Sequence, residues 1–178
     1  YAVGGLSDAD GAASNLVERY DLATKSWEEV APMVTPHEFH AVAVLDGKLY
    51  AVGGYNEEDS HLSLVERYDL ATKSWEEVEP MPSARSAAGV AVLDGKLYAV
   101  GGYGGGALSS VVRYDPEMNA WEEVAPMAEA REAHAVAVLD DKLYAVGGYN
   151  DDDGHLSSVE RYDPTLDAWE AVAMATTR

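Results

Sequence analysis

The chain has 178 residues, of which 47% are hydrophobic and 25% charged, a composition typical of globular rather than disordered proteins. Its 32 acidic and 12 basic side chains give a formal net charge of −20, which argues against nucleic acid and anionic membranes as partners, because both attract basic surfaces. It has no cysteine, so disulfide bonds, thiolate metal sites and a cysteine nucleophile are excluded. No apolar run approaches the roughly 20 residues needed to cross a bilayer.

An internal repeat dominates the sequence. The block Tyr-Ala-Val-Gly-Gly occurs four times, at intervals of 49, 48 and 46 residues, starting at Tyr1, Tyr50, Tyr98 and Tyr144. Each of the four tryptophans lies seven residues after the Tyr of a Tyr-Asp pair. A period of this length predicts repeated structural units that stack on one another. We place the units at about 1–38, 39–86, 87–132 and 133–178, within a single domain of residues 1–178.

Each complete repeat is predicted to form four short strands. The first strand, at 40–45, 88–93 and 134–139, is apolar on both faces, which is typical of a strand packed between neighbouring sheets. A two-residue turn follows, Asp46-Gly47 or Asp94-Gly95, and these residue types accept the positive φ angles of a tight hairpin; Asp140-Asp141 is a weaker version. The second strand ends in paired glycines, beside which another backbone or ring can pack closely. The pairs are Gly4 and Gly5, Gly53 and Gly54, Gly101 and Gly102, and Gly147 and Gly148.

The third strand of each repeat ends in Tyr-Asp, and the fourth begins near the tryptophan. A short turn joins them, marked in two copies by Asp-Pro. No stretch has a sustained 3.6-residue apolar period, so almost no helix is expected. We predict structural roles for the repeated aromatic residues, which are Tyr20, Tyr68, Tyr114, Tyr162, Trp27, Trp75, Trp121 and Trp169.

These features resemble the kelch repeat family, and in style the kelch domains of BTB-kelch adaptor proteins. The resemblance rests on the double glycine, the Tyr-Asp followed by Trp, the Pro-Met after the fourth strand and the spacing, and it covers essentially all 178 residues. It implies an all-β fold, a β-propeller whose blades are four-stranded antiparallel sheets. The chain departs from the family pattern because it has four repeats and because its first blade lacks the inner strand. We therefore expect an open fragment, or part of a larger or multichain ring.

In the kelch family, ligands usually meet a face built by two classes of loop. The first class follows the double glycine, at 6–15, 55–63, 103–109 and 149–157, and differs most between copies. Variable loops on a rigid scaffold suit binding, although they could equally be unselected solvent loops. The second class joins the fourth strand to the next first strand and carries a basic residue four positions after each Met. The candidate binding residues are Tyr55, Tyr103 and Tyr149 in the first class, and His37, Arg85, Arg131 and Arg178 in the second.

Each set of candidates has a structural alternative, which we favour. The tyrosines could cover the glycine pairs, and the basic residues could pair with the chain's own carboxylates, which outnumber basic groups by 32 to 12. Acidic clusters at 8–10, 57–59 and 151–153 could attract a basic peptide or a cation, or form a solvated rim. The first lacks the glutamate that a calcium loop needs at its twelfth position, where Arg19 stands.

No catalytic pattern is evident. The histidines at 40 and 134, and those at 61 and 155, repeat at equivalent positions, which favours a scaffold role. No metal-ligand spacing, nucleophile elbow or phosphate loop is present, so we predict no catalytic residue, metal or cofactor. A carbohydrate-active enzyme similar to sialic acid epimerases would need unique polar residues in one central pocket, whereas the polar residues here mostly repeat.

We therefore predict a non-enzymatic scaffold that binds a protein or peptide, preferably a basic one. If it is like the BTB-kelch adaptors, it is cytoplasmic. The near-identical copies also support an alternative, a designed or recently amplified propeller with no natural ligand. Exposed strand edges would favour self-association of several chains.

Overall fold

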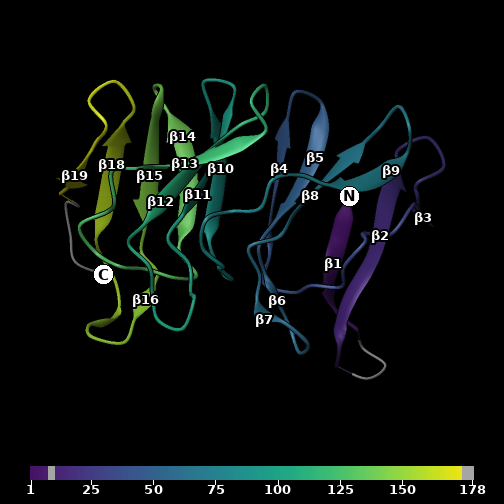
Figure 1. Ribbon diagram of the computed structural model, residues 1–178, viewed down its shortest axis with the longest axis horizontal. Helices are drawn as coiled ribbons and strands as arrows, with labels where there is room; N and C mark the ends of the chain where they lie inside the picture. Colours follow the sequence, from purple (N-terminus) through teal and green to yellow (C-terminus); the bar gives the residue numbers. More distant parts are fainter. Residues whose placement is uncertain (8–10, 174–178) are drawn as a thin grey trace.

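A computed structural model describes residues 1–7 and 11–173, and these residues form strands and turns but no helix. Most of the strands build four antiparallel sheets of three or four strands, which follow one another across the molecule in chain order, from the first at the right of Figure 1 to the last at the left. The sheets do not close into a ring. The predicted all-β fold, an open array of propeller blades, is confirmed. No helix that could span a membrane occurs in the part of the chain that the structure describes.

We number the sheets blades 1 to 4. Blade 1 has three strands, β1 (Ala2–Leu6), β2 (Ala13–Asp21) and β3 (Ser26–Glu29), and therefore lacks the inner strand, as predicted. Blade 2 consists of β4 (Ala41–Leu45), β5 (Lys48–Val52), β8 (Val65–Asp69) and β9 (Ser74–Glu77). Blade 3 consists of β10 (Gly89–Leu93), β11 (Lys96–Val100), β12 (Val111–Asp115) and β13 (Ala120–Val124). Blade 4 consists of β14 (Ala135–Leu139), β15 (Lys142–Val146), β18 (Val159–Asp163) and β19 (Ala168–Val172).

The loops after the paired glycines contain more regular structure than the sequence predicted. Those of blades 2 and 4 are short hairpins, β6 (Tyr55–Asn56) with β7 (Ser60–His61) and β16 (Tyr149–Asn150) with β17 (Gly154–His155). In blade 1, β2 begins at Ala13, so the predicted loop 6–15 is too long. The reason is that pairing continues past the glycines, with Leu6 opposite Ala13.

The core lies between neighbouring blades. Between blades 2 and 3, Tyr50 and Met81 belong to the same buried cluster as Leu97 and Tyr114. Equivalent clusters lie at the other two boundaries. Tryptophan strengthens each boundary, because its indole N–H donates to a backbone carbonyl of the preceding blade. The pairs are Trp75 with Ala31 at 3.0 Å, Trp121 with Glu79 at 2.8 Å and Trp169 with Ala125 at 2.9 Å.

The outer faces of the two end blades show side chains that the inner blades bury. Trp27 of blade 1 is 53% exposed, whereas its counterpart Trp75 is 8% exposed. Leu139 of blade 4 is 59% exposed, whereas Leu45 at the same position of blade 2 is 2% exposed. Each end therefore has the apolar character of a surface against which another blade packs.

Candidate functional site

Both classes of loop named above meet at one end of the blades, the lower end in Figure 1. We call this end the loop face. It comprises the described residues within 4–14, 33–40, 53–64, 81–88, 101–110, 127–134 and 147–158. The opposite end carries the two-residue turns between the first and second strands and the turns between the third and fourth.

Backbone pairing ties the two loop classes together at each complete blade. In blade 2, the N–H of Glu38 donates to the carbonyl of Tyr55 at 2.9 Å, and the N–H of Tyr55 donates back at 2.8 Å. Ser86 pairs with Tyr103 in the same way, and Glu132 with Tyr149. The three candidate tyrosines therefore hold equivalent places on the loop face.

Two of these tyrosines meet one histidine. The ring of His61 lies edge-on to Tyr55 at 5.4 Å between centroids and to Tyr103 at 5.1 Å, so it bridges blades 2 and 3. Its Nδ1 lies 3.0 Å from the Oγ of Ser86. The sequence predicts a scaffold role for His61, because His155 repeats it at the equivalent position. The sequence has no signal that distinguishes His61, which lies between two described blades, from His155, which does not.

Beside this aromatic cluster the loop face has a hollow of about 380 Å³. We call it the central hollow. Its lining residues come from the segments that lead into three successive inner strands and from the β6–β7 hairpin: Glu38, Phe39, Tyr55, His61, Ser86, Ala87, Glu132 and Ala133.

A chain of backbone hydrogen bonds forms one wall of the central hollow. The N–H of Ala87 donates to the carbonyl of Phe39 at 2.8 Å, and the N–H of Ala133 donates to the carbonyl of Ala87 at 2.9 Å. These three residues are equivalent, and each has a positive φ, 50°, 49° and 50° respectively. Phe39 is 62% exposed and is the only phenylalanine of the chain. Phe39 is not among the binding residues predicted from the sequence, although its difference from Ala87 and Ala133 is a usable signal.

Charge is segregated between the loop face and the rest of the molecule. Within its described part, the loop face has two arginines, Arg85 and Arg131, both fully buried, and no lysine. The same residues include nine carboxylates, none of them buried: Glu38, Glu57, Glu58, Asp59, Glu129, Glu132, Asp151, Asp152 and Asp153. Burial and the neighbouring Asp151 raise the pKa of Glu132.

At the opposite end, lysines and carboxylates pair. Lys48 lies 3.0 Å from Asp69, and Lys96 with Asp115 and Lys142 with Asp163 repeat the pair in blades 3 and 4. These lysines therefore neutralise carboxylates away from the loop face.

Comparison with known proteins agrees with this architecture. The sequence model of the KLHDC2/KLHL20/DRC7 Kelch-repeats domain matches residues 1–178. The chain belongs to the kelch-repeat family.

Three relatives illustrate the similarity. Kelch-like ECH-associated protein 1A of Danio rerio is 44% identical over 63 residues, which are 34% of this chain and 10% of the relative. Kelch-like protein 21 of Homo sapiens is 41% identical over 59 residues, 33% of this chain and 9% of the relative. Kelch-like protein terF of Aspergillus terreus is 39% identical over 62 residues, 33% of this chain and 14% of the relative. The matched stretches are thus a small part of each relative's length.

The basic residues that the kelch resemblance suggested for binding point into the protein. His37, Arg85 and Arg131 are all 0% exposed. Arg85 donates to the carbonyls of Gly101 at 2.9 Å and Ser110 at 3.2 Å, so it binds backbone of the next kelch repeat. Burial lowers its pKa to about 10. Arg178, the fourth candidate, lies outside the described residues.

His37 is held in the corresponding way at the boundary of blades 1 and 2. Its Nδ1 lies 2.7 Å from the carbonyl oxygen of Gly53, and its Nε2 lies 3.0 Å from the sulfur of Met33. Burial lowers the pKa of His37 and outweighs the opposite effects of the Gly53 carbonyl and Glu66. The His37 imidazole is therefore held by contacts within the protein in this kelch repeat.

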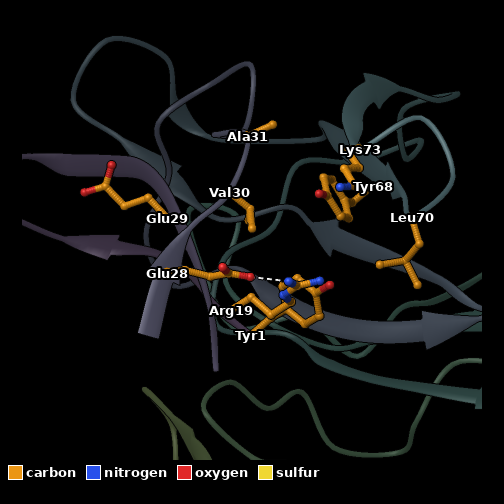
Figure 2. Close-up of a pocket in the computed structure, with 9 residues that line it drawn as sticks. All are labelled: Tyr1, Arg19, Glu28, Glu29, Val30, Ala31, Tyr68, Leu70 and Lys73. Carbon is orange, nitrogen blue, oxygen red and sulfur yellow. Dashed lines mark hydrogen bonds and ion pairs between the residues drawn. The ribbon is translucent and has the colours of Figure 1, made fainter. Parts of the chain in front are cut away.

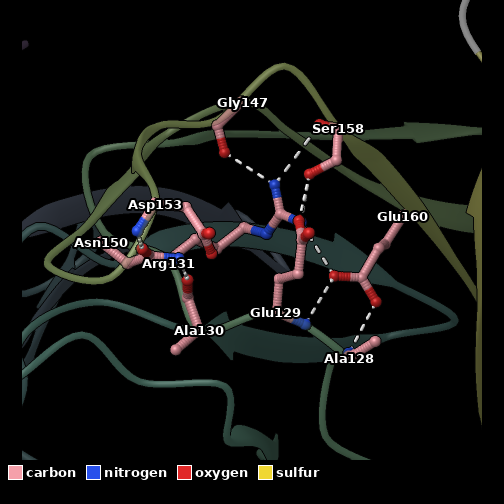
Figure 3. Close-up of polar contacts among 9 residues, drawn as sticks. All are labelled: Ala128, Glu129, Ala130, Arg131, Gly147, Asn150, Asp153, Ser158 and Glu160. Atoms are coloured by element: carbon pink, nitrogen blue, oxygen red, sulfur yellow. Dashed lines mark hydrogen bonds and ion pairs between the residues drawn. The ribbon is translucent and has the colours of Figure 1, made fainter.

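Arg131 shows internal pairing most fully, as Figure 3 shows. Its guanidinium donates to Glu160 at 2.8 Å and to the carbonyl of Gly147 at 2.7 Å. Glu160 also accepts the backbone N–H groups of Ala128 at 2.7 Å and Glu129 at 3.1 Å. These contacts are those expected if the basic residues pair with the chain's own groups.

A second hollow, of about 280 Å³, lies between blades 1 and 2, away from the loop face (Figure 2). Its arginine, Arg19, pairs with Glu28, so the hollow has no excess of one charge. At the boundary of blades 2 and 3, the side chain of Asn119 accepts the backbone N–H of Glu79 at 3.1 Å and so joins the two blades. At the boundary of blades 1 and 2 the equivalent residue is Lys73, whose side chain has no acceptor and cannot make this hydrogen bond.

The described carboxylates and histidines do not gather as metal ligands. No group of three or more such side chains in residues 1–7 and 11–173 has a metal-binding arrangement. The central hollow brings aromatic rings and two carboxylates together on the loop face, and we take it as the candidate site.

Proposed function

We propose that this chain is a non-enzymatic binding scaffold whose loop face holds a basic protein or peptide. The charge segregation carries this proposal. The described loop face has nine carboxylates that are not buried, and its two arginines are 0% exposed. A surface of one sign attracts a partner of the opposite sign and speeds its association.

The family relationship supports a binding role. The Danio rerio relative is named Kelch-like ECH-associated protein 1A, so its name describes an association of that protein with ECH. The repeated frame also suits binding, because loops of different sequence are held on equivalent blades. Because the loop face is acidic, we expect a basic partner. Exposed arginines would instead have favoured an acidic partner.

The experiment compares the affinity of the chain for a lysine- and arginine-rich peptide and for an acidic peptide of equal length, at rising salt concentration. We expect the basic peptide to bind and its affinity to fall as salt rises, because at 0.1 M salt the attraction between exposed charges more than about 10 Å apart is largely screened. Salt-insensitive binding of the acidic peptide would contradict the proposal.

A pair of charge-matched variants tests whether the loop face is responsible. The first replaces Asp151, Asp152 and Asp153 by asparagine, and the control replaces Glu29, Glu77 and Glu117, which lie off the loop face, by glutamine. Both remove three negative charges, so they change the net charge equally. We expect only the first to weaken peptide binding strongly. Equal weakening by both would show that the net charge, not the loop face, attracts the peptide.

A second role, self-association, is favoured by the exposed apolar faces of the end blades. We propose that blade 4 of one copy packs on blade 1 of another, because the faces with Leu139 and Trp27 correspond to faces that meet inside the array. In a longer chain, neighbouring blades would cover the same faces. Light scattering of the 178-residue chain tests the proposal: a concentration-dependent mass that Leu139→Lys reduces is expected, and a monomer at all concentrations would contradict it.

A further inference from the structure

We propose that the central hollow is a binding site for the cationic end of a lysine or arginine side chain. The inference rests on the proposed function for its context, since a basic peptide would supply the side chain. It goes further by naming one side-chain class and the residues that receive it.

Aromatic rings form part of the lining of the central hollow. Phe39, Tyr55 and His61 all line it, and Tyr55 and His61 meet edge to face at 5.4 Å. The faces of phenylalanine and tyrosine rings attract ammonium and guanidinium groups, because the π electrons make them negative. A cation with an apolar stem fits such a lining better than a carboxylate or a phosphate does.

Two carboxylates give the central hollow its charge. Glu38 and Glu132 line it, and none of its described lining residues is a lysine or an arginine. Both are half-buried, so their attraction for a cation is screened less than that of fully exposed carboxylates. The hollow therefore offers two means of binding a cation, aromatic rings and negative charge, and the lysines and arginines of the described residues do not line it.

Phe39 has no evident structural reason to be a phenylalanine. It has a φ of 50°, a conformation in which bulky residues are rare, and the equivalent residues of the next two repeats are Ala87 and Ala133. Its ring is 62% exposed, so it contributes little to the core. A strained, exposed aromatic residue at the edge of a hollow is the kind of outlier from which a binding role is inferred.

The lining is also held in place before any ligand arrives. Phe39 is fixed through its carbonyl, which accepts the N–H of Ala87 at 2.8 Å, and Glu38 and Tyr55 exchange two backbone hydrogen bonds. The Nδ1 of His61 lies 3.0 Å from Ser86. Little freedom of the backbone and of the His61 ring is therefore lost on binding, which favours affinity.

The chain itself supplies substitutions that the fold accepts. Phe39→Ala places alanine where Ala87 and Ala133 already adopt the same φ. Glu38→Ser with Glu132→Ser places serine where Ser86 stands. Glu57→Ser with Glu58→Ser is the charge-matched control, since these glutamates lie on the loop face but do not line the central hollow.

Two measurements test the site. The first follows the single phenylalanine, labelled with ¹³C, by NMR during titration with N-acetyl-arginine amide, and with the neutral analogue N-acetyl-citrulline amide as control. We expect a saturable shift with the arginine compound only. The second measures the affinity of each variant for the basic peptide. Phe39→Ala is expected to weaken it by about 2- to 30-fold, and the Glu38/Glu132 variant should weaken it more than the Glu57/Glu58 control.

The outcomes separate this inference from the proposed function. If the peptide binds but neither Phe39→Ala nor the Glu38/Glu132 variant changes its affinity, the inference is overturned and the proposed function stands. If no basic peptide binds but the arginine compound shifts the Phe39 signal saturably, the inference stands and the proposed function is overturned. If neither ligand has an effect, both are overturned.

Discussion

Arg131 and Glu160 form a buried ion pair, with 2.8 Å between Nη2 and Oε1 and with side chains that are 0% and 4% exposed. The pair joins the loop before blade 4 to a strand within it (Figure 3). One blade earlier, Arg85 occupies the place of Arg131, and Val112 occupies the place of Glu160. The backbone donor of Ala128, which Glu160 accepts, is also missing there, because its counterpart is Pro82. At these two boundaries, the buried carboxylate and the backbone N–H group that it accepts are thus either both present or both absent.

This correspondence predicts the effect of removing the carboxylate. Glu160→Val should lower the free energy of unfolding by about 3–5 kcal/mol, because it leaves the Arg131 guanidinium and two backbone N–H groups without their buried acceptor. Adding Ala128→Pro and Glu129→Ser, which copies Pro82 and Ser83, should recover part of the loss. Denaturant unfolding measures both. A triple variant no more stable than Glu160→Val would show that the two boundaries are not interchangeable.

The equivalent tryptophans should differ in importance. Trp75 is 8% exposed and donates to the carbonyl of Ala31, whereas Trp27 is 53% exposed. Trp75→Ala should therefore cost about 3–5 kcal/mol of unfolding free energy, and Trp27→Ala clearly less. The comparison is made by denaturant unfolding at a protein concentration where the chain is monomeric. A loss below about 1 kcal/mol for Trp75→Ala would show that it is not a core residue.

Sequence reasoning predicted the repeats, the strands and the missing inner strand because each depends on local pattern. The paired glycines and tryptophans recur at intervals of 46 to 49 residues, and each marks one strand. It favoured internal pairing of the basic loop residues with carboxylates, but it could not predict which groups they contact. Arg85 and Arg131 lie in loops, but those loops fold back so that the guanidinium groups reach carbonyls of the next blade.

The central hollow was also beyond sequence reasoning. It combines Phe39, His61 and Glu132, which come from three different segments of the chain. Their proximity depends on the angle between blades and on the positive φ of Phe39, and neither leaves a repeated pattern in the sequence.

Acid should destabilise the fold partly through His134. Its side chain is buried, and burial with the charge of Arg131 lowers its pKa to about 4, from about 6.5 when unfolded. The unfolded chain therefore binds the proton more readily, so stability is full above pH 6.5 and is lost as the pH falls towards 4. His134→Ala, which copies Ala88, should reduce the loss between pH 7.5 and 5 by about 2 kcal/mol. An unchanged pH dependence in the variant would contradict this assignment.

The hairpin turn of blade 4 should be open to stabilisation by a single glycine. Asp140 and Asp141 have φ angles of 49° and 55°, whereas the same turns in blades 2 and 3 have Gly47 and Gly95 at the second position. A Cβ atom added at Gly47 or Gly95 would meet no atom within 4 Å, so there is space for a side chain there. The cost of replacing either glycine is therefore that of the positive φ angle. Glycine adopts positive φ without strain, so Asp141→Gly should raise the free energy of unfolding by about 0.5–1 kcal/mol, and Gly95→Asp should lower it by a similar amount. Thermal unfolding checks both, with shifts of about 1–4 °C in opposite directions expected. Shifts of the same sign would mean that the side chain, and not the φ angle, decides the stability of these turns.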